Sequence, residues 1–172
     1  MIFRQTIILL IFSAIIGLAA NYISPNGIEL IGKYRDISSG NEPIIPPNAE
    51  AGDPSFIALD LAELEFNRGD ALFVDCREFE EFECGTIPGA INIPFDDLPD
   101  ENLEQYLDST LGFINKDNKI ITFCSGDECD LSLHLGRNLK AFGYTNIFIF
   151  FGGAREWENF GLGVERRVDC GK

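Results

Sequence analysis

The chain has 172 residues, and its hydrophobic content of 45% is enough for a folded domain and excludes wholesale disorder. Its formal net charge of -15 would repel a phosphate backbone, so nucleic acid is excluded as a partner. Five cysteines and one histidine provide no paired CxxC spacing, so we expect no structural metal site, and nothing in the sequence indicates another cofactor.

The N-terminal segment, residues 1–23, is an apolar run behind a single arginine, Arg4. It could be a transmembrane helix, because residues 5–23 approach the roughly 20 residues that a bilayer requires. It could also be a cleaved signal peptide, since its apolar region is short and ends in small residues, or a buried core helix. We expect a transmembrane anchor, because Leu18 interrupts the small-residue pattern of a cleavage site that would end at Ala20.

The short, positively charged N-terminus favours export of the rest of the chain. We therefore expect a single-pass, membrane-anchored protein whose domain faces the periplasm or the outer surface, or a secreted protein if the segment is cleaved. Such a compartment is oxidising and allows disulfide bonds.

Residues 24–54 are rich in proline and glycine and show neither helical nor strand periodicity. Prolines at this density favour extended polyproline II geometry, so we expect a linker between the anchor and a domain. The domain is expected at residues 55–165, followed by a loose tail at 166–172 that contains Cys170.

Apolar, strand-like runs alternate with segments of helical spacing between residues 55 and 165. Strands are expected at 71–76, 91–93, 120–123 and 147–151, and helices at 57–66, 78–83, 98–113 and 131–142 and around Trp157. Several of these strands are apolar on both faces. The fold class is therefore α/β, with a mainly parallel sheet covered by helices on both faces.

A cysteine stands at the end of the strand at 120–123 and is followed by a tight loop and a helix. Parallel sheets bind ligands at the carboxyl ends of their strands, and a helix N-terminus favours a thiolate. Cys124 could therefore be a reactive thiol, although an inert residue at the strand end is the alternative. The loop that follows consists of Ser125, Gly126, Asp127, Glu128 and Cys129.

Cys129 has two interpretations. It could pack as a small residue at the first turn of the helix, or it could form a disulfide with Cys124 if the loop folds back far enough.

Four motifs in this order resemble those of rhodanese-like (sulfurtransferase) domains, and they span about residues 55–165. They are Phe73–Glu78, Gly85–Pro94, the loop from Cys124, and Gly152–Trp157. The N-terminal segment and linker resemble those of membrane-tethered, single-domain bacterial members.

The resemblance implies that Cys124 takes sulfane sulfur and carries it as a persulfide, with Ser125 to Cys129 as its cradle. It implies supporting roles at the mouth of the site for Asp75 and Arg77. The implied partners are a sulfane-sulfur donor and a thiol acceptor, which could be a protein thiol.

The loop also departs from the family pattern. Thr86 replaces the usual histidine, and the loop glycine is at the third position rather than the fourth. Carboxylates at Asp127, Glu128 and Asp130 disfavour a dianion such as thiosulfate and oppose ionisation of the Cys124 thiol.

We therefore predict a sulfurtransferase that uses Cys124, with persulfide or disulfide chemistry favoured over thiosulfate. Two alternatives remain: a thiol–disulfide or persulfide-reducing protein that uses Cys124 and Cys129, and a non-catalytic binding module whose acidic face docks a partner.

Overall fold

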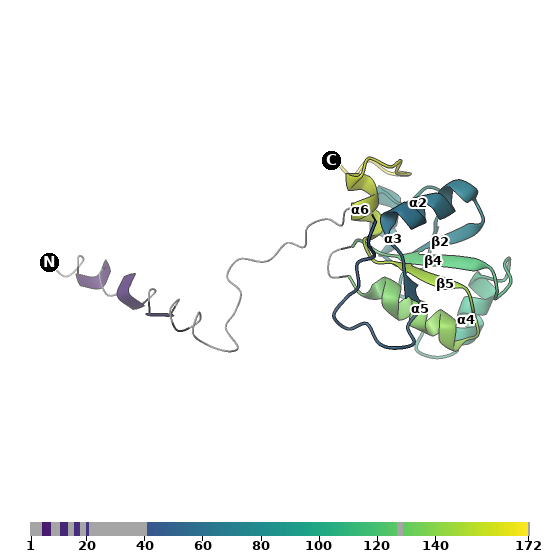
Figure 1. Cartoon of the computed structure of the whole chain (residues 1–172), viewed down its shortest axis with the longest axis horizontal. Helices are drawn as coiled ribbons and strands as arrows, with labels where there is room; N and C mark the ends of the chain where they lie inside the picture. The colour runs from purple at the N-terminus through teal and green to yellow at the C-terminus, as the bar shows by residue number, and fades with distance from the viewer. Residues whose placement is uncertain are drawn as a thin grey trace. The chain divides into compact units, whose positions relative to one another are not determined.

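The computed structural model describes residues 5–7, 11–13, 16, 17, 20, 41–126 and 129–171. The chain divides into two units, Met1–Asp36 and Ile37–Lys172, and the second unit carries the sheet and the site (Figure 1).

The expected transmembrane helix at residues 1–23 is wrong. In the described part of the chain, no helix has the length and apolar character needed to cross a membrane. Of residues 1–23, the structure describes 5–7, 11–13, 16, 17 and 20. The other residues of 1–23 lie outside the described residues, as do 24–40 of the expected linker. The α/β domain is the part of the expected fold class that the structure supports.

The second unit is built on a five-stranded sheet with the order β1-β5-β4-β2-β3, in which every neighbouring pair is parallel. The strands are β1 (Ser55–Phe56), β2 (Ala71–Asp75), β3 (Ile91–Asn92), β4 (Lys119–Phe123) and β5 (Ile147–Phe150). Asp75, Phe123 and Phe150 are aligned across β2, β4 and β5. The loops that leave these three strands therefore begin side by side at one edge of the sheet.

Helices cover both faces of the sheet, as the two-sided apolar strands predict (Figure 1). They are α2 (Leu59–Arg68), α3 (Phe79–Cys84), α4 (Leu103–Thr110), α5 (Leu131–Ala141) and α6 (Gly153–Asn159). Ile120 packs with residues of α4 and α5, whereas Ile121 packs with residues of α2 and α6. This alternation along β4 divides the core into two layers and buries the strand completely from Ile120 onward.

The expected helices and central strands are confirmed in order and type, with most ends shifted by one or two residues and two larger differences. The helix expected at 98–113 begins only at Leu103, because Asn102 has a left-handed backbone with φ of 60° and Pro99 disfavours helical geometry at the residue before it. The two-residue strand β1 was not expected, because so short a run carries no periodicity of its own.

The last part of the expected linker lies against the domain. Arg137 of α5 donates from Nε and Nη2 to the carboxylate of Asp53 at 2.7 and 2.9 Å, and Lys140 donates to the carbonyl of Gly52. The hydrogen bond from Arg137 lowers the pKa of Asp53. These contacts join residues near 53 to the helix that follows the cysteine loop.

Candidate active site

The cysteine loop begins at the carboxyl end of β4, and the first residues of α6 hydrogen-bond to its backbone. The backbone N–H of Ala154 donates to the carbonyl of Cys124 at 2.8 Å, and that of Arg155 donates to the carbonyl of Ser125 at 3.1 Å. These hydrogen bonds satisfy backbone N–H groups in the first turn of α6 and fix the backbone of Cys124.

Two glycines make this close approach sterically feasible. Gly126 has φ of 92°, and a Cβ there would lie 2.2 Å from the carbonyl oxygen of Gly152. Gly153 has φ of 62°, and a Cβ there would lie 2.2 Å from the carbonyl oxygen of Cys124. Both positions therefore require glycine for conformation and for space.

The Cys124 thiol is fully buried. Its sulfur donates to the carbonyl of Cys129 at 2.9 Å and lies 3.7 Å from the hydroxyl of Ser132, which is also fully buried. Burial raises the pKa of Cys124, and the interaction with Cys129 raises it further. The Cys124 thiol is therefore the proton-retaining member of the pair.

Cys129 is only partly buried and behaves in the opposite way. The hydrogen bond from the Cys124 thiol lowers the pKa of Cys129 to about 6, against the opposing effect of burial. The backbone N–H groups of Leu131, at the start of α5, and of Ser125 lower it further. The thiolate that we expected at a helix N-terminus is thus better stabilised on Cys129 than on Cys124.

Asp75 and Arg77 form a rigid frame beside this loop. Asp75 is fully buried and accepts from Arg77 Nε at 2.9 Å, from Arg77 Nη2 at 2.6 Å and from the Thr86 hydroxyl at 2.7 Å. Arg77 Nη2 also donates to the carbonyl of Gly85 at 2.7 Å. Burial opposes the charge of Arg77, but the hydrogen bonds and charge of Asp75 outweigh it and raise the Arg77 pKa. The ion pair is fully hydrogen-bonded, as a buried charge requires.

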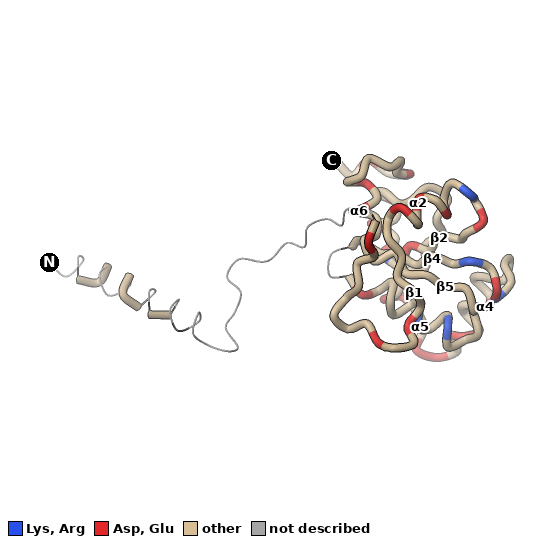
Figure 2. Tube along the Cα trace, in the orientation of Figure 1, with Lys and Arg blue, Asp and Glu red and all other residues tan. Residues whose placement is uncertain are grey.

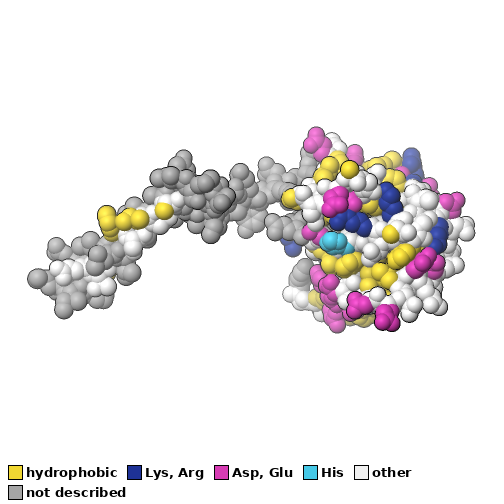
Figure 3. All heavy atoms as spheres, turned by 90° about the horizontal axis from the view of Figure 1, so that it is seen from below, with side chains coloured by type: hydrophobic (Ala, Val, Ile, Leu, Met, Phe, Trp, Pro, Cys, Tyr) yellow, Lys and Arg dark blue, Asp and Glu magenta, His cyan; other side chains and the backbone are white. Residues whose placement is uncertain are grey.

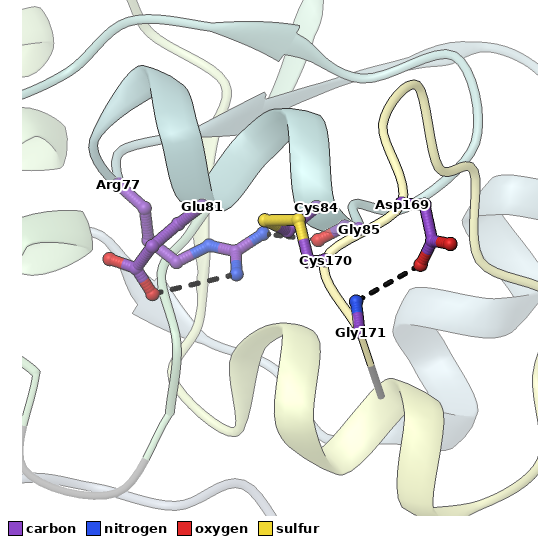
Figure 4. Close-up of a disulfide and its surroundings, with 7 residues drawn as sticks. All are labelled: Arg77, Glu81, Cys84, Gly85, Asp169, Cys170 and Gly171. Atoms are coloured by element: carbon purple, nitrogen blue, oxygen red, sulfur yellow. Dashed lines mark hydrogen bonds and ion pairs between the residues drawn. A yellow bond between two sulfur atoms is a disulfide. The ribbon is translucent and has the colours of Figure 1, made fainter.

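The cysteines pair differently from the disulfide that we considered. Cys124 and Cys129 are both free thiols, as is the buried Cys76. Cys84, at the end of α3, is instead bonded to Cys170, with 5.6 Å between the two Cα atoms (Figure 4). The tail that we expected to be loose is therefore covalently attached to α3.

A pocket of about 350 Å³ lies next to the loop. It is lined by Ser125 of the loop, by Arg77, by Arg155 of α6, by Arg166 of the C-terminal segment and by both disulfide cysteines. The structure thus brings together Asp75, Arg77, Cys124, Ser125, Gly126 and Cys129 of the predicted site. Asp127 and Glu128 lie outside the described residues.

Sequence reasoning assigned no role to three polar residues of the site. Thr86, noted as a departure from the family pattern, donates to Asp75, and Asn92 donates to the carbonyls of Asp75 and Arg77. Ser132 lies behind the Cys124 sulfur. The first two belong to the Gly85–Pro94 motif, which is the signal that could have indicated them; Ser132 carried no such signal.

The chain matches the family model of the rhodanese-like domain over residues 58–160. Thiosulfate:glutathione sulfurtransferase of Homo sapiens is 34% identical over 113 residues, which are 62% of this chain and 95% of that protein. An HTH-type transcriptional regulator of Mycobacterium tuberculosis is 32% identical over 116 residues, or 66% of this chain. This chain spans about half of the regulator, 47% of its length.

Solved structures share the fold. The Alr3790 protein of Anabaena sp. has a TM-score of 0.50 at 21% identity, over 63% of this chain and 79% of that chain. Thiosulfate sulfurtransferase of Pseudomonas aeruginosa has a TM-score of 0.50 at 22% identity, over 68% of this chain and 21% of that chain. The family model covers more than half of the sequence, and strand β4 of the parallel sheet leads into the cysteine loop. This chain therefore belongs to the rhodanese-like domain family.

Proposed function

We propose that this domain is a sulfurtransferase that carries sulfane sulfur as a persulfide on Cys124. The observation that carries the proposal is the pair of free thiols at the end of β4, one of which holds its proton while the other loses it readily. The name of the human relative, thiosulfate:glutathione sulfurtransferase, supports a sulfane-sulfur donor and a thiol acceptor.

In the first half-reaction, the Cys124 sulfur attacks the outer sulfur of the donor. The S–S bond of the persulfide forms, the bond between the outer sulfur and the rest of the donor breaks, and the donor remnant leaves with the bonding electron pair. The proton of the Cys124 thiol passes to the Cys129 thiolate, which already interacts with that thiol. Cys129 thus takes up the proton that the buried nucleophile must lose when the S–S bond forms.

In the second half-reaction, a deprotonated acceptor thiol attacks the outer sulfur of the Cys124 persulfide. The acceptor becomes a persulfide, and Cys124 leaves as a thiolate that takes back the proton held by Cys129. No net oxidation of the protein occurs, because sulfur passes from donor to acceptor in the sulfane state.

A second candidate function uses the same two cysteines for reduction. The Cys129 thiolate attacks the inner sulfur of the Cys124 persulfide, forms a Cys124–Cys129 disulfide and releases hydrosulfide. An external dithiol must then return two electrons to the disulfide. The lowered pKa of Cys129 favours this alternative, since the attacking thiol is ionised near neutral pH.

The surface gives less support to a non-catalytic binding module that docks through an acidic face. On the face shown in Figure 3, acidic side chains are scattered among apolar and basic ones and form no continuous acidic surface. We therefore place this alternative behind the two enzymatic ones.

Mass spectrometry of the full chain after exposure to thiosulfate, or to an organic persulfide, tests the proposal. We expect Cys124 to gain the mass of one sulfur atom and to lose it on addition of a thiol. A Cys124–Cys129 disulfide with release of hydrosulfide would identify the reductive alternative. Absence of any adduct on Cys124 with either donor would leave only the binding module.

We also propose that the domain works in an oxidising compartment. The Cys84–Cys170 disulfide supports this placement, because such bonds persist outside the reducing cytosol. The test is the thiol state of Cys84 and Cys170 in protein that is alkylated inside cells before lysis. Complete alkylation of both residues would contradict the placement.

A further inference from the structure

We propose that the pocket beside the cysteine loop binds the acceptor as a small thiol that carries both carboxylate and ammonium groups, and that the disulfide-bonded C-terminal segment forms its specificity-determining wall. This inference deepens the proposed function and rests on it for the role of the ligand. The segment, residues 164–170, is here called the C-terminal wall.

The position of the pocket suits a reactant of the Cys124 loop. Ser125 directly follows the nucleophile and lines the pocket, and so does Arg77, which is held by the buried Asp75. A volume of about 350 Å³ lies in the range of small-molecule sites. A molecule the size of an amino acid or short peptide could therefore place its thiol at the loop while the rest of it occupies the pocket.

The charges that line the pocket are balanced, unlike those of the whole chain. The chain has 28 acidic and 13 basic residues, and its acidic residues are spread over many elements (Figure 2). The pocket brings three arginines together with three glutamates, namely Arg77, Arg155 and Arg166 with Glu80, Glu81 and Glu158. A ligand with charges of both signs meets opposite charges here, whereas a pure anion meets as many carboxylates as guanidinium groups.

Arg166 is the best placed residue of the wall to contact such a ligand. Its Cγ and Nε lie 3.7 and 3.8 Å from the position that a Cβ of Gly85 would occupy, and Arg77 donates to the carbonyl of the same glycine. The two guanidinium groups therefore flank Gly85 on the pocket side. Arg166 Nη2 pairs with Glu158, and a guanidinium carries five N–H donors in all.

Backbone hydrogen bonds, side-chain contacts and the disulfide together hold the C-terminal wall against the domain. Thr86 and Glu165 exchange two backbone hydrogen bonds at 3.0 and 2.9 Å, and Arg167 and Val168 donate to the carbonyl of Glu83. The backbone N–H of Gly89 donates to the Glu165 carboxylate, and the Arg167 guanidinium lies over the Phe82 ring. Cys170 is bonded to Cys84, and both residues line the pocket (Figure 4). The bond thus fixes the end of the wall beside α3.

Binding can be tested without any reaction by isothermal titration calorimetry of the full chain with S-methylglutathione. This thioether has both kinds of charge but can neither accept sulfur nor reduce the disulfide. We expect saturable binding that Arg166→Gln weakens by about tenfold or more, as loss of a charge-assisted hydrogen bond predicts. The variant with both Cys84→Ser and Cys170→Ser should bind several-fold more weakly, because the wall loses its covalent attachment.

Arg68→Gln is the matched control, because Arg68 is also an exposed arginine paired with a glutamate, Glu65, but does not line the pocket. It should bind as the unmodified chain does. 3-(Methylthio)propionate, which lacks the ammonium group, should bind more weakly than S-methylglutathione. Absence of saturable binding, equal binding by Arg166→Gln, or equal binding of the carboxylate-only ligand would overturn the inference.

Kinetics separate this inference from the proposed function. Arg166→Gln should raise the acceptor KM by about tenfold, whereas Arg68→Gln should leave it unchanged. An unchanged acceptor KM contradicts the acceptor role of the pocket even if persulfide forms. Absence of persulfide in the unmodified chain instead contradicts the proposed function, and calorimetry still decides whether the pocket binds the thioether.

Discussion

The two cysteine pairs of this domain differ in every respect that governs their chemistry. Cys124 and Cys129 are five residues apart, free and directed into the loop at the end of β4. Cys84 and Cys170 are 86 residues apart and bonded to each other. Sequence proximity would have favoured the first pair, and the sequence led us to consider only that one.

The difference follows from what holds each backbone. The start of α6 fixes the carbonyls of Cys124 and Ser125, and in this arrangement the Cys124 thiol donates to the carbonyl of Cys129. The hydrogen bonds of the C-terminal wall to Thr86 and Glu83 bring Cys170 to the end of α3. The pair at the loop is thus arranged for reaction, and the distant pair for attachment.

The largest effect should come from Cys124→Ser. If the loop pair is the reactive one, this substitution should lower the rate of sulfur transfer by at least about a thousandfold, because no other group supplies the nucleophile. The measurement is steady-state transfer from a persulfide donor to a thiol. The variant with both Cys84→Ser and Cys170→Ser should still form persulfide on Cys124. Equal losses of transfer rate in Cys124→Ser and in the double variant would contradict the assignment of the reaction to the loop pair.

Removal of the distant disulfide should mainly affect stability. The variant with Cys84→Ser and Cys170→Ser should lose about 2–5 kcal/mol of unfolding free energy, because the bond closes a loop of 86 residues in the unfolded chain. Cys129→Ser, which breaks no disulfide, should change it by less than about 1 kcal/mol. Urea denaturation measures both. Similar losses would show that the disulfide adds no more to stability than a free thiol.

Gly153→Ala should displace the reactive pair. A Cβ at this position would lie 2.2 Å from the carbonyl oxygen of Cys124, and Gly153 has a left-handed backbone that alanine rarely adopts. We therefore expect the variant to lose about 2–3 kcal/mol of unfolding free energy and most of its transfer activity. Gly161→Ala is the matched control, because Gly161 has φ of 79° but nothing within 4 Å of its Cβ position. That variant should cost only about 1–2 kcal/mol and retain activity. Equal loss of activity in Gly153→Ala and Gly161→Ala would show that activity does not depend on the close contact between Gly153 and the Cys124 carbonyl.

The smallest effect concerns ionisation within the reactive pair. Alkylation of Cys129 by iodoacetamide requires the thiolate. Its rate should therefore rise with pH, with a midpoint at the Cys129 pKa of about 6, and level off at higher pH. Cys124→Ala removes the donor that lowers this pKa and should move the midpoint upward, so that alkylation at pH 7 becomes slower. Peptide mass spectrometry assigns the modified residue. A midpoint unchanged by Cys124→Ala would show that the two thiols do not interact.

Several features of the site followed from local patterns. The apolar run before Cys124 and the helical spacing after it were enough to place that residue at a strand end, and the structure confirms this position. The Gly152-Gly153 motif was also visible, but its purpose was not, because the contact of Gly153 with the carbonyl of Cys124 joins residues far apart in the chain. The predicted membrane anchor was wrong, because no helix in the described part of the chain is long and apolar enough to cross a membrane.

The sequence by itself determined the α/β class, the order of most elements and the strand end that carries the first thiol. Such features depend on periodicities of two and 3.6 residues, which each segment carries within itself. Only the tertiary structure decided that Cys84 bonds to Cys170, that Cys129 ionises before Cys124, and that Arg166 lines a pocket with Arg77. These outcomes depend on burial, on backbone donors and on distances between segments, which no local pattern encodes.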